Sequence, residues 1–134
     1  NFAGIAFGHA GCAAVHALSY PLGGAHHVPH GQSNQLMFAD VMRKYQEKKP
    51  VGKLNKLEEI LAAELDTEPV FALEELYKLM NAVLEKKQLR EVGVTADELP
   101  VYAKTVLETQ QRLLNNNYVE LTEEDILSIY TNAF

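Results

Sequence analysis

The sequence predicts an all-α fold, and two observations carry this prediction. Apolar residues recur at intervals of three and four along most of the chain, which is the spacing of one face of an α-helix. No run alternates between apolar and polar residues for more than a few positions, so strands are not expected. The 134 residues are enough for one buried core, and we predict a single helical bundle over residues 1–134.

The first predicted helix covers residues 3–20, a stretch of small apolar side chains that suits close packing on most sides. A proline and two glycines follow Tyr20, so the helix is expected to end there and residues 21–29 to form a loop. Pro29 has no N–H that would be left unpaired at a helix start. A second helix is therefore predicted from position 30 to about position 46.

Charged, leucine-rich helices are predicted in the rest of the chain, over residues 54–65, 70–84 and 101–114. Thr95 and Glu98 have the spacing of a capping box, so a short helix is expected to begin at Thr95. Residues 89–94 are expected to be irregular and residues 115–117 to form a turn. Thr122 is expected to cap the last helix, because the three acidic residues after it suit the positive end of a helix.

Charge and cysteine content exclude several kinds of partner. The net charge is −6, and a phosphate-binding protein needs a basic face, so we expect neither nucleic acid nor an anionic membrane as partner. The most apolar stretch, residues 2–21, contains two histidines and several glycines, which makes it a poor membrane span. Cys12 is the single cysteine and can form no intrachain disulfide, so a cytoplasmic domain is expected.

The first residues suggest that the chain continues upstream. The sequence opens at Asn1 within an apolar pattern and has no polar leader. We therefore expect a longer protein, cut just before or inside a buried helix.

All five histidines lie in residues 1–42, and two of them are predicted to bind a metal. His16 lies on an apolar helix, where a single histidine is more often a core residue with one hydrogen bond than a ligand. His30 changes this interpretation, because the loop before it can fold the chain back towards His16. Two converging imidazoles suit a borderline divalent ion such as Fe²⁺ or Zn²⁺. They do not complete a site, so other ligands must come from elsewhere or from His9, Cys12, His26 or His27.

Helical spacing places four side chains on one face of the first predicted helix: His9, Cys12, His16 and Tyr20. On this interpretation Cys12 and Tyr20 line the metal cavity, one turn on each side of His16. Alternatively, Cys12 is a small buried hydrophobe and Tyr20 a core aromatic whose hydroxyl bonds to the backbone. The neighbouring pair of histidines at positions 26 and 27 belongs either to a solvated loop or to the pocket.

The segment around these histidines resembles the second signature of the iron-containing alcohol dehydrogenases. That signature begins with a helix of the form Gly-x-x-x-x-His. A Pro-His-Gly segment follows, with its histidine fourteen residues after the first one, and then an Asn. The residues that match it here are Gly11, His16, Pro29–Gly31 and Asn34. Residues 10–23 and the tail 121–130 are most similar to the NAD-dependent group that acts on 4-hydroxybutyrate. The resemblance covers the whole chain, and its most specific part is residues 4–34.

The resemblance implies that the chain is the helical, metal-binding C-terminal domain of a two-domain dehydrogenase. His16 and His30 would be two of four metal ligands, and an Asp and a His before Asn1 would be the others. An N-terminal domain, also upstream, would bind NAD(P). Many members of the family have a second histidine where this chain has Tyr20. A proton relay at that position would use a phenol with a reference pKa of about 10.

The implied reaction is a reversible hydride transfer between 4-hydroxybutyrate and succinate semialdehyde, with the metal as Lewis acid. Tyr20 is the candidate catalytic residue, and the candidate substrate pocket consists of Phe7, Cys12, His26 and His27. A homo-oligomer is expected. Two alternatives stay open: a related dehydrogenase for another small alcohol or aldehyde, and a helical metal-binding or interaction module that works alone.

Overall fold

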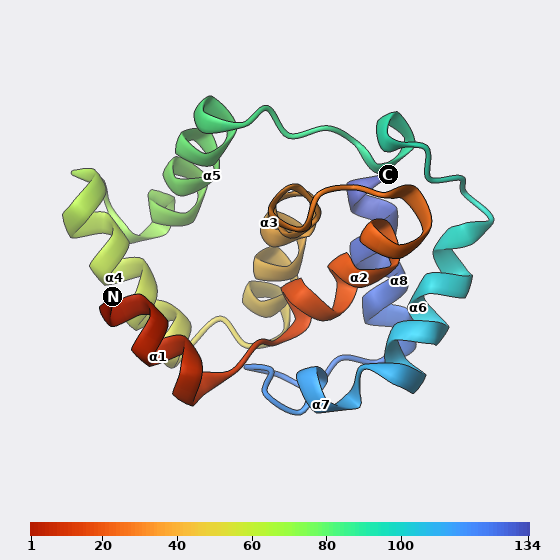
Figure 1. The fold of residues 1–134 in the computed structure, drawn as a ribbon. Helices are drawn as coiled ribbons and strands as arrows, with labels where there is room; N and C mark the ends of the chain where they lie inside the picture. The colour runs from red at the N-terminus through yellow and green to blue at the C-terminus, as the bar shows by residue number, and fades with distance from the viewer.

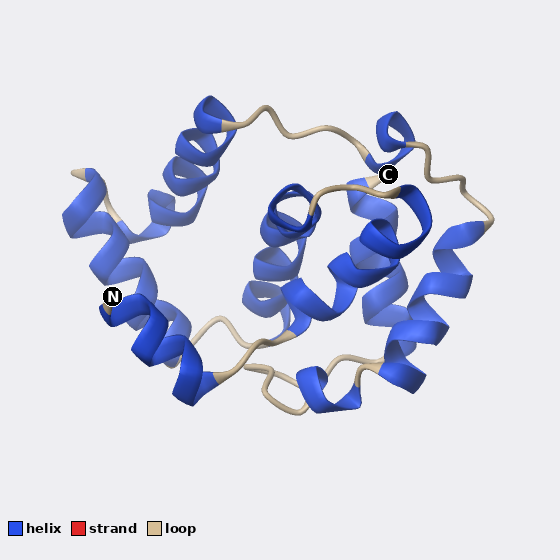
Figure 2. Ribbon diagram, in the orientation of Figure 1, coloured by secondary structure: helices blue, strands red, loops and turns tan.

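The structure is a computed structural model that describes all residues 1–134, and every regular element in it is helical (Figures 1 and 2). The elements in chain order are α1 (Phe2–Ala10), α2 (Ala14–His26), α3 (His30–Lys48), α4 (Lys53–Leu65), η1 (Pro69–Phe71), α5 (Ala72–Val83), η2 (Leu89–Val92), α6 (Glu98–Thr109), α7 (Gln111–Leu114) and α8 (Glu123–Ala133). There is no strand, so the predicted all-α class is confirmed.

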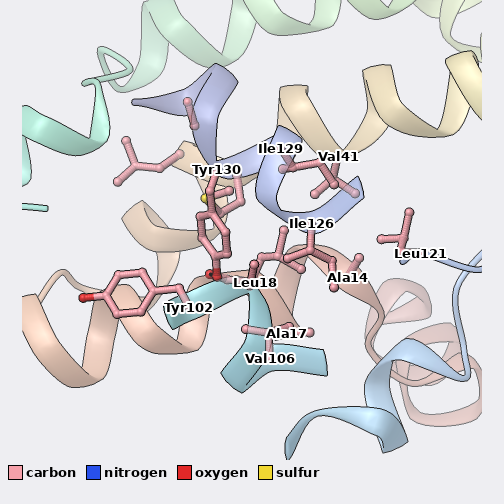
Figure 3. Close-up of a cluster of buried hydrophobic side chains, with 14 of the residues drawn as sticks. Ala14, Ala17, Leu18, Val41, Tyr102, Val106, Leu121, Ile126, Ile129 and Tyr130 are labelled. Atoms are coloured by element: carbon pink, nitrogen blue, oxygen red, sulfur yellow. Dashed lines mark hydrogen bonds between the residues drawn. The ribbon is translucent and has the colours of Figure 1, made fainter. Parts of the chain in front are cut away.

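The core lies between four helices, because α2 packs against α3 and α6, and α8 packs against α3 and α6. Tyr130 of α8 stands at its centre, with no exposed surface (Figure 3). Its hydroxyl donates a hydrogen bond to the Leu18 carbonyl of α2 over 2.7 Å, which satisfies a polar group that would otherwise be buried unpaired. Fully buried side chains from all four helices complete the core, among them Leu18, Leu22, Leu36, Val41, Val106, Ile126 and Ile129.

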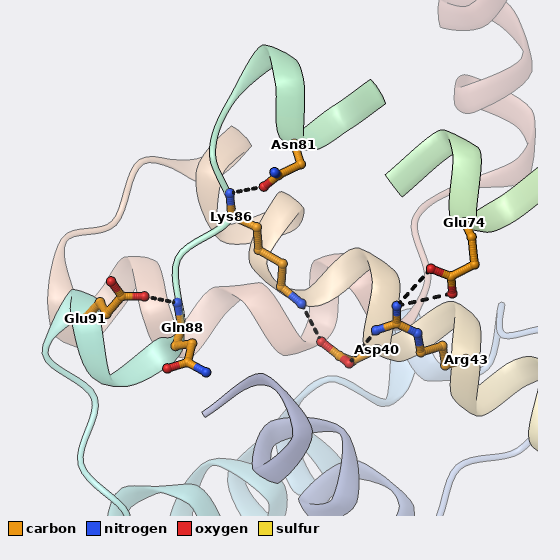
Figure 4. Close-up of polar contacts among 7 residues, drawn as sticks. All are labelled: Asp40, Arg43, Glu74, Asn81, Lys86, Gln88 and Glu91. Carbon is orange, nitrogen blue, oxygen red and sulfur yellow. Dashed lines mark hydrogen bonds and ion pairs between the residues drawn. The ribbon is translucent and has the colours of Figure 1, made fainter. Parts of the chain in front are cut away.

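Helices α4 and α5 form a hairpin that packs mainly on itself and on η1. Figure 1 shows this hairpin and α1 on one side of the molecule, away from α6 and α8. A buried carboxylate ties the hairpin to α3: Asp40, only 5% exposed, accepts from Lys86 over 2.7 Å and from Arg43 over 3.4 Å (Figure 4). Arg43 also donates to Glu74 of α5 over 3.2 Å.

The helix predicted over residues 3–20 is in fact two helices, α1 and α2, which meet at 92°. Gly11 ends α1 with φ 72°, a conformation that glycine adopts without steric cost. The break is held by side chains from the far end of the sequence. Asn117 Oδ1 accepts from the Ala14 N–H over 2.7 Å, and Asn116 donates to the Cys12 carbonyl over 3.0 Å. These bonds satisfy backbone groups that a continuous helix would have paired internally.

The prediction that residues 3–20 pack closely on most sides was also wrong for the first half of this stretch. Helix α1 has no buried residue, and Phe2 is 89% exposed. The apolar composition was read correctly, but no other part of this chain covers the helix. None of the helices is both long and apolar enough to cross a membrane alone; α1 and α2 meet that test only as a bent pair.

The loop predicted over residues 21–29 is much shorter, because α2 continues through Pro21 to His26. A proline removes one helical hydrogen bond, yet burial of Leu18 and Leu22 on either side of it stabilises the continued helix. The start of α3 at His30 is confirmed.

The helices predicted in the second half are present, but several boundaries differ. The helix predicted over residues 70–84 begins as η1 and continues as α5, and η2 lies within residues 89–94, which were expected to be irregular. The Thr95 N–H and hydroxyl both donate to the Glu98 carboxylate, which is only half of a capping box, and the helix itself begins at Glu98. The helix predicted over residues 101–114 is divided at Gln110 into α6 and α7. Thr122 caps α8 as predicted, because its hydroxyl accepts from the Asp125 N–H over 3.2 Å.

Candidate metal centre

The fold brings His16 and His30 together, although fourteen residues separate them in the sequence. His16 is on the first turns of α2, and His30 is the first residue of α3. The chain reverses through His27, whose backbone takes the left-handed conformation at φ 54°, and through the buried Val28. The two imidazole ring centroids lie 5.2 Å apart with an interplanar angle of 53°.

Both imidazoles direct the same nitrogen towards one side chain on α3. The Asn34 Nδ2 atom lies 3.4 Å from His16 Nε2 and 3.2 Å from His30 Nε2. Because His30 and Asn34 are four residues apart on a helix, they share one face. The two Nε2 atoms thus converge on one point, which is the arrangement that a shared metal ion requires.

Two aromatic rings flank the imidazoles. The Phe7 ring of α1 lies 6.5 Å from the His16 ring, and the Tyr20 ring lies 6.3 Å from the His30 ring at an interplanar angle of 28°. Tyr20 is one turn beyond His16 on α2 and is 41% exposed. The sequence prediction that Tyr20 shares a face with His16 is therefore confirmed, and its ring stacks on the second histidine.

The surroundings favour the neutral form of His16. Partial burial lowers the pKa of the His16 imidazole below its usual value, and the neighbouring His30 ring lowers it further. A neutral imidazole keeps a lone pair on one of its two ring nitrogens, and this is the form that binds metals.

The two histidines fit a borderline divalent ion as part of a site but not as a whole one. Imidazole nitrogens are ligands for iron and zinc. No group of three His, Cys, Asp or Glu side chains lies close enough in residues 1–134 to hold an ion. The sequence hypothesis that His9 or Cys12 could complete the site therefore has no support, and further ligands would come from outside this chain.

The stripe predicted along one helix face does not form as a whole, because Gly11 ends α1 before α2 begins. His9 is on the exposed last turn of α1, and Cys12 is half-buried in the break between the helices. His27 is exposed and ends α2, with no side-chain hydrogen bond within the chain. Of the four stripe residues, only His16 and Tyr20 stay on a common helix.

His26 makes its contacts on a different element, α6. Its Nε2 lies 2.8 Å from the Tyr102 hydroxyl and 3.2 Å from Glu98 Oε1, and Tyr102 donates to the same carboxylate over 2.6 Å. Hydrogen bonds from Tyr102 first, and then from Thr95, lower the pKa of Glu98 to about 2. No hydrogen bond or ring contact connects His26 to the imidazole pair.

Sequence reasoning assigned no function to Asn34 beyond its match to the signature, nor any to the Glu98–Tyr102 pair. Helical spacing could have indicated both, because each is an i, i+4 relation, between His30 and Asn34 and between Glu98 and Tyr102. Spacing could not have indicated the histidine that contacts each pair from another helix. These two histidines are His16 and His26.

Comparisons with known proteins place this geometry in a family. The family model for the "Fe-containing alcohol dehydrogenase family, C-terminal" matches residues 1–134. The chain is 46% identical to the 4-hydroxybutyrate dehydrogenase of Clostridium kluyveri over all of its own length and 36% of that protein's. It is 36% identical to long-chain-alcohol dehydrogenase 1 of Geobacillus thermodenitrificans over 98% of the chain and 34% of that relative.

Solved structures have the same fold. A 1,3-propanediol oxidoreductase superposes with a TM-score of 0.69 at 25% identity, covering 90% of this chain and 32% of that one. An archaeal alcohol dehydrogenase from a Red Sea brine pool gives a TM-score of 0.78 at 21% identity, covering 91% and 32%. The chain thus spans about a third of the length of the relatives that it matches. It belongs to the Fe-containing alcohol dehydrogenase family and corresponds to the C-terminal part of its members.

Proposed function

We propose that this chain is the metal-binding part of an NAD(P)-dependent alcohol dehydrogenase that interconverts 4-hydroxybutyrate and succinate semialdehyde. His16 and His30 are its contribution to a site for Fe²⁺ or Zn²⁺. The observation that carries the proposal is the convergence of both Nε2 atoms on one point beside Asn34. The 46% identity to a 4-hydroxybutyrate dehydrogenase supports the choice of substrate.

The proposal divides the chemistry between this chain and the rest of the protein. A divalent ion held by His16 and His30 would supply Lewis-acid chemistry at the substrate oxygen, and a nicotinamide cofactor would supply the hydride chemistry. The relatives are about three times as long as this chain, so we place the nucleotide-binding domain and the remaining ligands upstream of Asn1.

The chain's own residues define the surroundings of the reacting oxygen. His16 and His30 present their Nε2 atoms to one point, and the Phe7 ring lies 6.5 Å from the His16 ring. Tyr20 lies on the His30 side with its hydroxyl free of hydrogen bonds within the chain, so it can orient a substrate or a cofactor.

The substrate carboxylate requires a cationic or hydrogen-bonding partner. His26 is engaged with Glu98 and Tyr102, whereas His27 is exposed and unpaired, so His27 is the better of the two histidine candidates.

A related dehydrogenase for another alcohol is the second candidate, and the 36% identity to a long-chain-alcohol dehydrogenase supports it. Steady-state kinetics of the full-length protein with 4-hydroxybutyrate and with a long-chain alcohol distinguish the two. A higher kcat/KM for the long-chain alcohol would replace the proposed substrate without affecting the metal site.

The metal site is tested separately in the full-length protein. His16→Ala and His30→Ala should each abolish metal retention, measured by elemental analysis, because each removes one of only a few bonds to the ion. The matched control is His9→Ala, since His9 is an exposed histidine of the neighbouring helix and should leave metal content unchanged. Stoichiometric metal in His30→Ala would refute the site. Circular dichroism should show unchanged helix content in all three variants.

A further inference from the structure

The Asn34 side chain lies against both metal-binding nitrogens at once. Its Nδ2 is 3.2 Å from His30 Nε2 and 3.4 Å from His16 Nε2, and no other side chain in the chain hydrogen-bonds to either imidazole. A primary amide nitrogen carries two hydrogens, so one can be directed at each ring. An amide nitrogen accepts no hydrogen bond, and both Nε2 atoms must therefore be the acceptors.

This hydrogen-bond pattern determines the tautomer of both rings. A neutral imidazole that accepts at Nε2 carries its proton at Nδ1. That tautomer is also the one in which Nε2 can bind a metal ion. A single amide thus selects, for two histidines on two helices, the proton position that coordination needs.

The other end of the amide makes no hydrogen bond that would fix its orientation. Asn34 Oδ1 is buried and has no hydrogen-bond partner in the chain. If the amide were turned over, the oxygen would face two Nε2 lone pairs, and both rings would have to move their protons to Nε2 to avoid repulsion. Only the two imidazoles bond to the amide, so its orientation and their tautomers are coupled.

We propose that Asn34 is a positioning residue that holds His16 and His30 in the Nδ1–H tautomer, with both Nε2 lone pairs converging for the ion. This inference rests on the proposed metal site and adds a residue to it that is not itself a ligand. It has a thermodynamic consequence, because each Nε2 lone pair can either accept a hydrogen bond from the amide or bind the ion, but not both. The amide therefore organises the rings before the ion binds and gives up both hydrogen bonds when it does.

The direct test is ¹⁵N NMR of histidine-labelled, metal-free full-length protein. In the unmodified protein, His16 and His30 should both show an unprotonated Nε2 and a protonated Nδ1. Asn34→Asp keeps the side-chain size but replaces the donor by an acceptor, so both protons should move to Nε2. In Asn34→Leu, which can neither donate nor accept, each ring should show a mixture of tautomers.

The second measurement is metal affinity by competition with a chelator, with Zn²⁺ as the probe. Asn34→Leu should bind Zn²⁺ about fivefold more tightly, as expected for two long hydrogen bonds that no longer compete with the ion. Gln32→Leu is the matched control, because it replaces an amide by the same apolar side chain on the same helix and should leave tautomers and affinity unchanged.

The two proposals fail in different ways. Unchanged tautomers in both Asn34 variants, or an unchanged Zn²⁺ affinity in Asn34→Leu, would overturn the positioning role. Retention of metal by His16→Ala and His30→Ala would instead overturn the metal site itself. Asn34→Ala repeats both measurements if the leucine variant does not fold.

Discussion

The two sides of this molecule use similar apolar helices in opposite ways. On the side of α2, α3, α6 and α8, large side chains such as Leu36, Val106 and Ile129 are fully buried. On the side of α1, α4 and α5, large apolar side chains remain exposed: Phe2, Ile5, Ile60, Val70, Phe71, Leu79 and Val83. Apolar periodicity shows which face of a helix is buried when another element packs against it. It does not show whether that element belongs to the same chain.

The candidate metal centre lies where the two sides meet. His16 and His30 are held by the well-packed side through α2 and α3, whereas Phe7 reaches His16 from the exposed helix α1. Large apolar side chains exposed on one side of a protein are typical of interfaces. The two histidines are therefore built on well-packed helices, next to an exposed apolar surface.

The largest expected difference in stability is between two isoleucine-to-alanine substitutions, one on each side of the molecule. Ile129→Ala should lower the free energy of unfolding by about 3–4 kcal/mol, because it leaves a cavity at a fully buried position. Ile60→Ala, on the 52% exposed residue of α4, should cost less than about 0.5 kcal/mol. Urea unfolding measures both. Equal losses would show that α4 is buried in solution and would remove the contrast between the two sides.

An intermediate effect is expected at the carboxylate that connects the two sides. Asp40→Ala removes a 5% exposed acceptor from Lys86 and Arg43, which are themselves partly exposed. We expect a loss of about 1–2 kcal/mol, because the two cations can turn to water rather than stay buried unpaired. Hydrogen exchange should quicken in α5 more than in α8. The matched control is Glu59→Ala on an exposed ion pair, which should change little.

The smallest effect is a change in pH dependence on the well-packed side. The pKa of Glu98 is lowered to about 2, so its stabilising contribution is complete above the usual carboxyl value of 4.5 and is lost as the pH falls towards 2. The unmodified protein should therefore lose stability more steeply than Glu98→Gln between these two pH values. Urea midpoints at pH 7, 4.5 and 3 test this. If the urea midpoints of the two proteins differed by the same amount at all three pH values, the prediction would be contradicted.

Local sequence patterns predicted much of the candidate site. His30 was placed correctly at a helix start, because Pro29 fits the position before or at the first turn. Tyr20 was placed correctly beside His16 by helical spacing. His9 was misplaced, since the same spacing assumed a helix that continues through Gly11. Nothing near Gly11 in the sequence shows that Asn116 bonds to Cys12 and that Asn117 bonds to Ala14.

The sequence by itself determined the all-α class, the apolar faces and the start of a helix at His30. These follow from interactions within a few residues, such as helical periodicity, capping and the fixed φ of proline. Only the tertiary structure decided the break between α1 and α2, the contact of His26 with α6, and the placement of the Asn34 amide against two imidazoles. Each of these depends on a hydrogen bond between segments distant in sequence, and such a bond exists only when packing has brought both partners together.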